Sequence, residues 1–117
     1  PKRYCPMSFF DSEVVRAEMA EIHELQEEVY NNVFKFPTMN AADQKYHVDI
    51  LERLLEKQKV LYTRLSLSDD PQAQEMKNRI TESAEMFGLP SNVDMNLLFD
   101  NMNQAVAIMK RQIDNQL

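Results

Sequence analysis

The chain has a single glycine, Gly88, and only five prolines in 117 residues. A β-sheet of this size needs several tight turns, and such turns depend on glycine, proline and asparagine at defined positions. With so little turn material, the chain can contain only a few long elements joined by short connections, which favours helices. We therefore predict an all-α fold.

Prolines and capping residues divide the first half of the chain into two long predicted helices. The first runs from about Phe9 to Lys35 with Ser8 as its N-cap, and Pro37 ends it because proline disfavours a helical conformation in the preceding residue. The second begins with Asn40 as N-cap and closes at the stretch SLSDDP. The connection between them is short, so an antiparallel helical hairpin is expected.

The second half of the chain predicts a short helix followed by a long one. Asp70 and Pro71 are a strong start signal, because an aspartate can cap the helix and proline suits its first position. Gly88 lies just past this helix, where a left-handed C-cap is expected. The long helix runs from about residue 93 to 115, capped by Ser91 or Asn92. We expect residues 9–117 to form a single helical domain with bundle or coiled-coil-like packing, and residues 1–8 to be a flexible N-terminal extension.

The fourth predicted helix carries an apolar heptad pattern. Its members alternate spacings of four and three residues, and they are Met95, Phe99, Met102, Val106, Met109 and Ile113. The seam could pack inside the chain, form a homodimer contact, or serve as a groove for a foreign helix, a role that the flexible side chain of methionine suits. The last two interpretations predict an exposed apolar patch on the monomer, whereas the first predicts none.

Two glutamines interrupt the apolar stripes of the hairpin. Gln26 in the first predicted helix and Gln58 in the second stand where apolar residues are expected. A buried amide must find hydrogen-bond partners or it lowers stability. We therefore expect both side chains at the edge of a seam or in a less buried interface.

Acidic residues are concentrated in the first predicted helix. The net charge is −6, and four glutamates lie near one face: Glu18, Glu21, Glu24 and Glu28. They could pair with the mildly basic second helix, remain solvated, bind a basic protein, or mimic nucleic acid. Within the second helix, Asp49 and Arg53 are spaced for an ion pair. The negative net charge disfavours direct nucleic-acid binding, which depends on clustered Lys and Arg.

The sequence contains no recognisable catalytic or cofactor motif. A single glycine excludes a glycine-rich phosphate loop, and neither His23 nor His47 has the glutamate three residues earlier that metal sites in helical bundles use. His23 and Glu27 are spaced for a weak metal contact at most. We predict no catalytic residue, no cofactor and no metal, and hence no enzyme.

Hydropathy and cysteine content indicate the compartment. No stretch approaches the roughly 18 consecutive apolar residues of a membrane span, and the N-terminus lacks the apolar run of a signal peptide. Cys5 is the only cysteine, so the chain cannot form an internal disulfide. These features predict a cytoplasmic protein without a membrane partner.

Three stretches carry a resemblance to a known family: MSFFDSEVV, LLEKQKVLYTRLSLSDD and MFGLPSNVDMNLLFDNMNQAVAIMKRQI. From about Met7 to Ile113, the chain resembles a small family of uncharacterised helical proteins, a domain of unknown function, found in cyanobacteria and in the T4-like phages that infect them. The resemblance implies a bacterial cytoplasm, including one during phage infection. It brings no functional residues, because the family has no established activity.

These observations favour a non-catalytic adaptor or regulator, phage-encoded or host-encoded, that binds another protein of a cytoplasmic machine. The candidate interface residues are the six apolar residues of the heptad seam and the four glutamates named above. One alternative is a self-associating structural or virion-assembly protein, for which a homodimer is the simplest form. A further alternative is an acidic regulator of RNA polymerase or another nucleic-acid enzyme, whose complex would weaken with salt.

Overall fold

The computed structural model describes residues 9–86, 88 and 94–117, and these residues are almost entirely helical. No strand occurs in the described ranges, so the all-α prediction is confirmed. The elements are the 3₁₀ segment η1 (Phe9–Asp11), helix α1 (Glu13–Asn32), the 3₁₀ segment η2 (Val33–Thr38), and helices α2 (Ala41–Leu67), α3 (Pro71–Met86) and α4 (Met95–Asp114).

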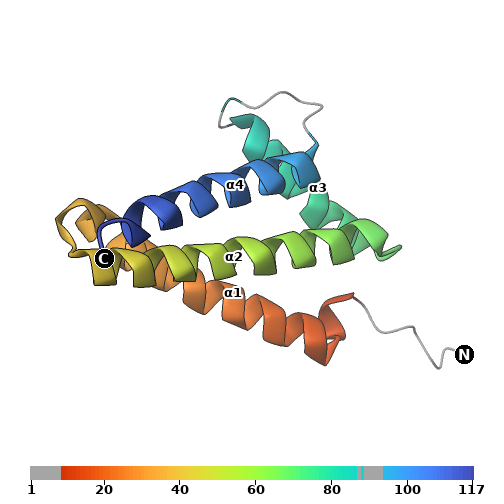
Figure 1. The fold of residues 1–117 in the computed structure, drawn as a ribbon. Coiled ribbons are helices and arrows are strands. Elements are labelled where there is room, and N and C mark those ends of the chain that lie inside the picture. Colours follow the sequence, from red (N-terminus) through yellow and green to blue (C-terminus); the bar gives the residue numbers. More distant parts are fainter. Residues whose placement is uncertain (1–8, 87, 89–93) are drawn as a thin grey trace, which may run out of the picture.

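Helix α2 lies in the middle of the molecule (Figure 1). Helices α1 and α4 flank it on different sides, and both run antiparallel to it. The shorter α3 leaves the far end of α2 and leads back toward the start of α4. The result is elongated, with extents of 62 × 31 × 20 Å. The predicted hairpin, short helix and long helix are all present.

The hydrophobic core is organised along α2. The core consists of three clusters of buried side chains, and each contains residues of α2. The members from α2 are Leu54, Leu61 and Leu65 in the cluster with α1 and α3, Val48 and Leu55 in the cluster with α4, and Tyr62 in the cluster with α3 and the start of α4. Helix α2 is therefore the element against which the others pack.

Helix α1 is shorter at both ends than the sequence predicts. The Ser12 hydroxyl accepts a hydrogen bond from the Val15 N–H at 3.4 Å, so the helix starts one turn later than the predicted cap Ser8, which lies outside the described residues. At its other end the backbone tightens into η2 before Pro37 is reached. Val33 consequently lies in η2 and not in α1, and it is 41% exposed.

Two of the predicted helix ends are confirmed. The side-chain oxygen of Asn40 accepts a hydrogen bond from the Asp43 N–H at 2.8 Å, so Asn40 caps α2. Gly88 has a φ of 94°, the left-handed conformation expected beyond α3, and its N–H donates to the Glu85 carbonyl oxygen at 3.0 Å. A residue with a Cβ would be strained in that conformation.

The start of α4 differs from the prediction. Asp94 caps this helix, since its carboxylate accepts hydrogen bonds from the N–H groups of Asn96 and Leu97 at 3.0 and 3.5 Å. The predicted caps, Ser91 and Asn92, lie outside the described residues. A carboxylate at this position also interacts favourably with the positive end of the helix dipole.

Asp70 links η1, which precedes α1, to the start of α3 at the open end of the hairpin. One carboxylate oxygen accepts a hydrogen bond from the Gln72 N–H at 2.8 Å and so caps α3, as predicted. The other accepts from the Phe9 N–H at 2.5 Å, which fixes η1 to the start of α3. The Phe9 hydrogen bond, followed by that of Gln72, lowers the pKa of Asp70 below its ordinary value because both stabilise the charged form.

Leu65 and Leu67 provide a matched test of the core. Leu65 has no exposed surface, whereas Leu67, two residues away on the same helix, is 81% exposed. We expect Leu65→Ala to lower the free energy of unfolding by about 2–5 kcal/mol, because it leaves a cavity at the centre of a cluster. Leu67→Ala should change it by less than about 0.5 kcal/mol. Urea unfolding followed by circular dichroism measures both, and equal effects would contradict the described packing.

The Asp70 cap predicts a pH-dependent loss of stability. Because folding lowers its pKa, the stabilisation is present above the ordinary aspartate pKa and is lost as the pH falls through the lower folded value. Asp70→Ala should therefore destabilise the protein at neutral pH, and the difference from wild type should shrink below about pH 3.9. Unfolding titrations at several pH values test this, with Asp69→Ala, at an exposed neighbour, as the control. A pH-independent difference would contradict the assignment.

Candidate protein-binding surfaces

The heptad seam of α4 is internal. Four of its residues are buried, Met102 and Met109 are half-buried, and all six pack in clusters that contain residues of α2. The buried four are Met95, Phe99, Val106 and Ile113. The structure thus shows the first of the three interpretations. The chain's own helices cover most of their surface, so the six do not form the continuous exposed patch that a partner or a second copy would need, although Phe99 also lines a groove described below.

Ion pairs flank this internal seam. Lys110 Nζ on α4 lies 3.0 Å from Glu52 Oε1 and 3.4 Å from Asp49 Oδ1, both on α2. The hydrogen bond that Lys110 donates to Glu52, followed by the one it donates to Asp49, raises the pKa of Lys110. The predicted pair between Asp49 and Arg53 is absent, because Asp49 turns to Lys110 and Arg53 to Glu21 on α1. Contacts between helices have replaced the contact within α2.

Two of the four candidate glutamates hold the hairpin together. Glu18 Oε1 lies 3.0 Å from Arg64 Nε. Glu21 pairs with Arg53 at 2.7 Å and with Lys57 at 3.1 Å, and these partners, Lys57 first, lower the pKa of Glu21. Both glutamates therefore face α2, which agrees with the expectation that an acidic first helix pairs with a basic second one.

The other two candidate glutamates differ from each other. Glu28 accepts a hydrogen bond from the Tyr46 hydroxyl at 3.0 Å, which raises the pKa of Tyr46. Glu24 is exposed and has no ion pair with any described residue. Nearby, Glu27 Oε1 lies 2.9 Å from His23 Nε2. The four predicted glutamates are consequently not one continuous free surface, and Glu24 and Glu27 are exposed carboxylates in the middle of α1.

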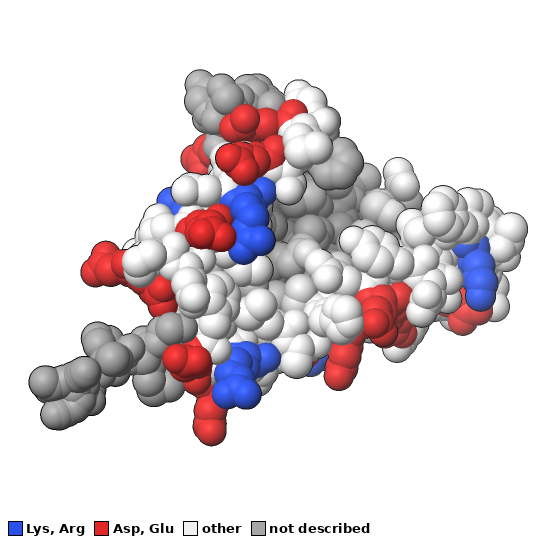
Figure 2. Space-filling model, turned by 180° about the vertical axis from the view of Figure 1, so that it is seen from behind, with Lys and Arg blue, Asp and Glu red and all other residues white. Residues whose placement is uncertain are grey.

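An apolar groove opens on the side of α2 that α1 and α4 leave uncovered. It has a volume of about 440 Å³ and receives side chains from all four helices. Figure 2 shows this hollow as a mostly uncharged surface with acidic and basic side chains around it. The lining residues are Met19, Ile22, His23, Gln26, Gln58, Leu61, Tyr62, Met76, Ile80 and Phe99. Sequence reasoning missed the groove, because no single helix contains it.

Gln26 and Gln58 both line the groove. Each is half-buried, as expected for residues at the edge of a core. Neither side-chain amide forms a hydrogen bond with another described residue. Their interruption of the apolar stripes was thus the one sequence signal for this site, since it marked the faces of α1 and α2 that remain open.

The described residues contain neither a metal-binding cluster nor a membrane-spanning helix. No three His, Cys, Asp or Glu side chains among them lie together in a way that could hold a metal ion, and the pair of His23 and Glu27 is exposed to solvent. Within the same ranges, no helix combines the length and the apolar character needed to cross a membrane. Cys5 lies outside the described residues.

The sequence matches a family model described as a domain of unknown function (DUF1825) over residues 7–113. This range covers the first three helices and nearly all of α4, and so includes the groove and the internal seam. No curated protein and no solved structure matches the chain.

Met102 and Leu97 test whether the seam is internal. Met102 packs in two of the core clusters, whereas Leu97, on the same helix, is 58% exposed. We expect Met102→Glu to lower the free energy of unfolding by roughly 1–3 kcal/mol, because it forces a charge against apolar side chains. Leu97→Glu should have little effect. Thermal melting and light scattering give stability and mass. A fully stable Met102→Glu protein whose mass has changed would instead indicate an intermolecular seam.

Proposed function

The chain belongs to the DUF1825 family, whose domain has no known function, and from its surface we propose that it is a non-catalytic adaptor that binds another protein. In this proposal the groove between α1 and α3 holds an amphipathic segment of the partner, with apolar side chains inside and Lys or Arg outside. The observation that carries the proposal is an open, apolar groove lined by two glutamine side chains that form no hydrogen bond with another described residue.

The shape and composition of the groove suit a set of apolar side chains. Met19, Ile22, Met76 and Ile80 form its walls from α1 and α3, and Phe99 contributes from α4. Burying such a surface against a partner is favourable in proportion to the apolar area removed from water. The two methionines can also adapt to side chains of different shape, as in other grooves that accept helices.

The glutamines give the groove polar anchor points. The amides of Gln26 and Gln58 each offer a donor and an acceptor, and within the described residues these groups have no partner. Both glutamines are half-buried, so water can reach these amides in the free protein. A bound segment that excluded this water would need polar groups opposite them, because a buried unpaired amide lowers affinity. Two amides in an apolar groove can therefore fix the register of a ligand.

The charge of the groove edge favours a cationic partner. His23 lines the groove, and its contact with Glu27 places a carboxylate at the α1 edge. Glu24 lies nearby on the outer side of α1 without an ion pair to any described residue. On the α3 edge, Arg79 is partly neutralised by Glu75 at 3.7 Å. With a net charge of −6, the protein would attract a basic segment and accelerate its association.

The biological setting is proposed from the sequence resemblance. Stretches such as LLEKQKVLYTRLSLSDD suggest a cytoplasmic protein of cyanobacteria or their phages, acting on a machine of the host cell. The alternative of a self-associating structural protein loses its main support, because the seam that would have joined the copies is covered within the chain.

Gln26 and Gln104 test the groove as a binding site. Gln104 is exposed on α4, outside the groove. We expect a synthetic amphipathic Leu/Lys peptide to bind the wild type and the Gln104→Arg variant equally. Gln26→Arg should weaken binding by about tenfold or more, because it fills the groove and repels the lysines. Fluorescence anisotropy of the labelled peptide measures affinity, and melting curves verify that both variants fold.

Two further measurements can overturn the proposal. A Leu/Glu peptide of the same pattern should bind more weakly than its Leu/Lys counterpart, so equal binding would refute the cationic partner. Light scattering determines the mass in solution, and a large ordered homo-oligomer would favour the structural alternative. A peptide that bound Gln26→Arg as tightly as wild type would show that the groove is not the site.

A further inference from the structure

The side of α1 that lines the groove continues beyond it as an apolar surface. His23 and Gln26 of this helix belong to the groove lining. Tyr30 follows His23 by seven residues, and Val33 follows Gln26 by the same number. Seven residues make about two helical turns, so these side chains point to the same side as the groove residues. Because Tyr30 is 69% exposed, the uncovered side of α1 is longer than the groove.

The other walls of the groove continue in the same direction, toward the closed end of the hairpin. On α2, Leu51 lies seven residues before Gln58 and packs in both the cluster with α1 and the cluster with α4. On α4, Met102 and Met109 pack in the latter cluster and are half-buried, like Leu51. Figure 2 shows an uncharged surface that runs from the hollow toward this end. We call the following residues the apolar extension of the groove: Tyr30, Val33, Phe34, Leu51, Met102 and Met109.

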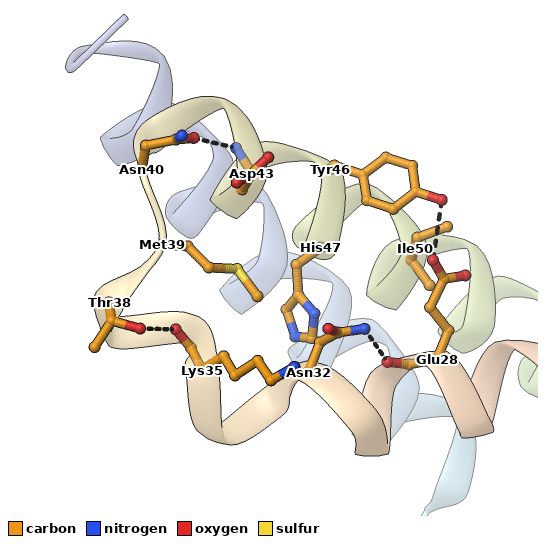
Figure 3. A pocket seen from close by; sticks show the side chains of 10 residues that line it. All are labelled: Glu28, Asn32, Lys35, Thr38, Met39, Asn40, Asp43, Tyr46, His47 and Ile50. Carbon is orange, nitrogen blue, oxygen red and sulfur yellow. Dashed lines mark hydrogen bonds between the residues drawn. The ribbon is translucent and has the colours of Figure 1, made fainter.

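The opposite side of α1 at this end is occupied by α2. Glu28 precedes Tyr30 by two residues, so it lies about 200° away around the helix axis. Its Oε1 accepts a hydrogen bond from the Tyr46 hydroxyl of α2 at 3.0 Å (Figure 3). Tyr30, in contrast, forms no hydrogen bond or ring contact with any described residue. The hairpin therefore uses one side of α1 and leaves the Tyr30 side uncovered.

Phe34 lies at the end of the apolar extension. It follows Tyr30 by four residues, in η2, and is 93% exposed, the highest value of any large apolar side chain in the described ranges. An aromatic ring in this position gains nothing from folding, because water still surrounds it. On contact with a partner it would bury a large apolar area, and aromatic residues often carry much of the binding energy of an interface. Tyr30 and Phe34 are therefore suited to anchor a partner.

The charge beside the extension favours the same cationic partner as the groove. No residue of the apolar extension is charged. Glu27 is exposed on α1, four residues after His23 and three before Tyr30, so its carboxylate lies beside both. Lys35 follows Phe34, but it belongs to the lining of a separate cavity on the Tyr46 side of the hairpin (Figure 3). A partner with Lys or Arg along its outer edge would therefore meet a carboxylate next to the extension.

We propose that the partner segment is an amphipathic α-helix of about four turns, which lies along α1 from the groove to Phe34. This inference rests on the proposed adaptor function and specifies the shape of its ligand. The 15 residues from Met19 to Phe34 correspond to about 22 Å of helix. Contact positions repeat every three or four residues along α1, as expected for a helix bound in a groove. The described residues contain no strand, so they offer no sheet edge to which an extended segment could add.

Three synthetic helical peptides of equal length and net charge distinguish the groove from its extension. The first carries leucines along one whole face and lysines on the other, and in the other two the leucines of one half are replaced by glutamine. Leucine and glutamine have similar helix propensities, so the change alters mainly the apolar face. We expect the first peptide to bind the wild type at least about tenfold more tightly than either half-apolar peptide, because only it can cover the groove and the extension together. Fluorescence anisotropy measures the affinities, and NMR carbon shifts of the bound peptide report its conformation.

Tyr30 and Phe34 supply the matched variant. Both are exposed, so the double change Tyr30→Ser and Phe34→Ser should leave the melting temperature unaltered. It should reduce the affinity of the first peptide to that of the half-apolar peptides, which bind in the groove and should be unaffected. Tyr46→Ser replaces a tyrosine that is 58% exposed on the opposite side, and this variant should bind all three peptides like the wild type.

The outcomes separate this inference from the function on which it rests. If no peptide binds, the groove is not a site and both proposals fail. If the half-apolar peptides bind and Gln26→Arg weakens them, the groove stands, and equal affinity of the first peptide would overturn the extension alone. The extension is also overturned if the double variant keeps full affinity for the first peptide, if Tyr46→Ser weakens that peptide equally, or if the bound peptide is extended rather than helical.

Discussion

The packing of α1 and α4 against different sides of α2 is the interaction on which the rest of the structure depends. Leu61 and Leu65 contribute to the cluster with α1, while Val48 and Leu55 contribute to the cluster with α4. A single helix that is covered on two sides keeps a further side open unless another element covers it. Here α3 covers it only in part, and Gln58 remains half-buried in the groove that results. The candidate binding site is thus a direct consequence of the central position of α2.

Ion pairs follow the same arrangement. The acidic excess of α1 is partly neutralised by cations of α2, as in the contact of Glu21 with Arg53. In the same way, Lys110 of α4 pairs with carboxylates of α2. Such exposed pairs contribute little stability individually, but they disfavour alternative registers of the helices. Among the acidic side chains of α1 without an ion pair to α2, Glu27 contacts the groove-lining His23, where it favours a basic partner. Packing and charge therefore indicate the same surface.

Helix ends show which parts of the fold the sequence could predict. Asn40 and Asp70 were identified correctly, because each is followed by a helix whose first turn it can cap without help from distant residues. The start of α1 was placed at Ser8, although Ser12 is an equally suitable cap one turn later. Phe9, at the start of η1, is held by a residue far away in the chain, because its N–H donates to the Asp70 carboxylate. The local sequence identifies possible N-cap residues, whereas the conformation of the segment around them also depends on long-range contacts.

By itself, the sequence determined the all-α class, the order of long and short helices and the heptad seam of α4. These features depend on spacings of three and four residues and on the scarcity of glycine, which the chain displays directly. Only the tertiary structure decided that α2 covers the seam, that Arg53 pairs with α1, and that Gln26 and Gln58 share a groove. The physical reason is that these contacts join residues many turns apart, whose meeting depends on how whole helices pack and not on local periodicity.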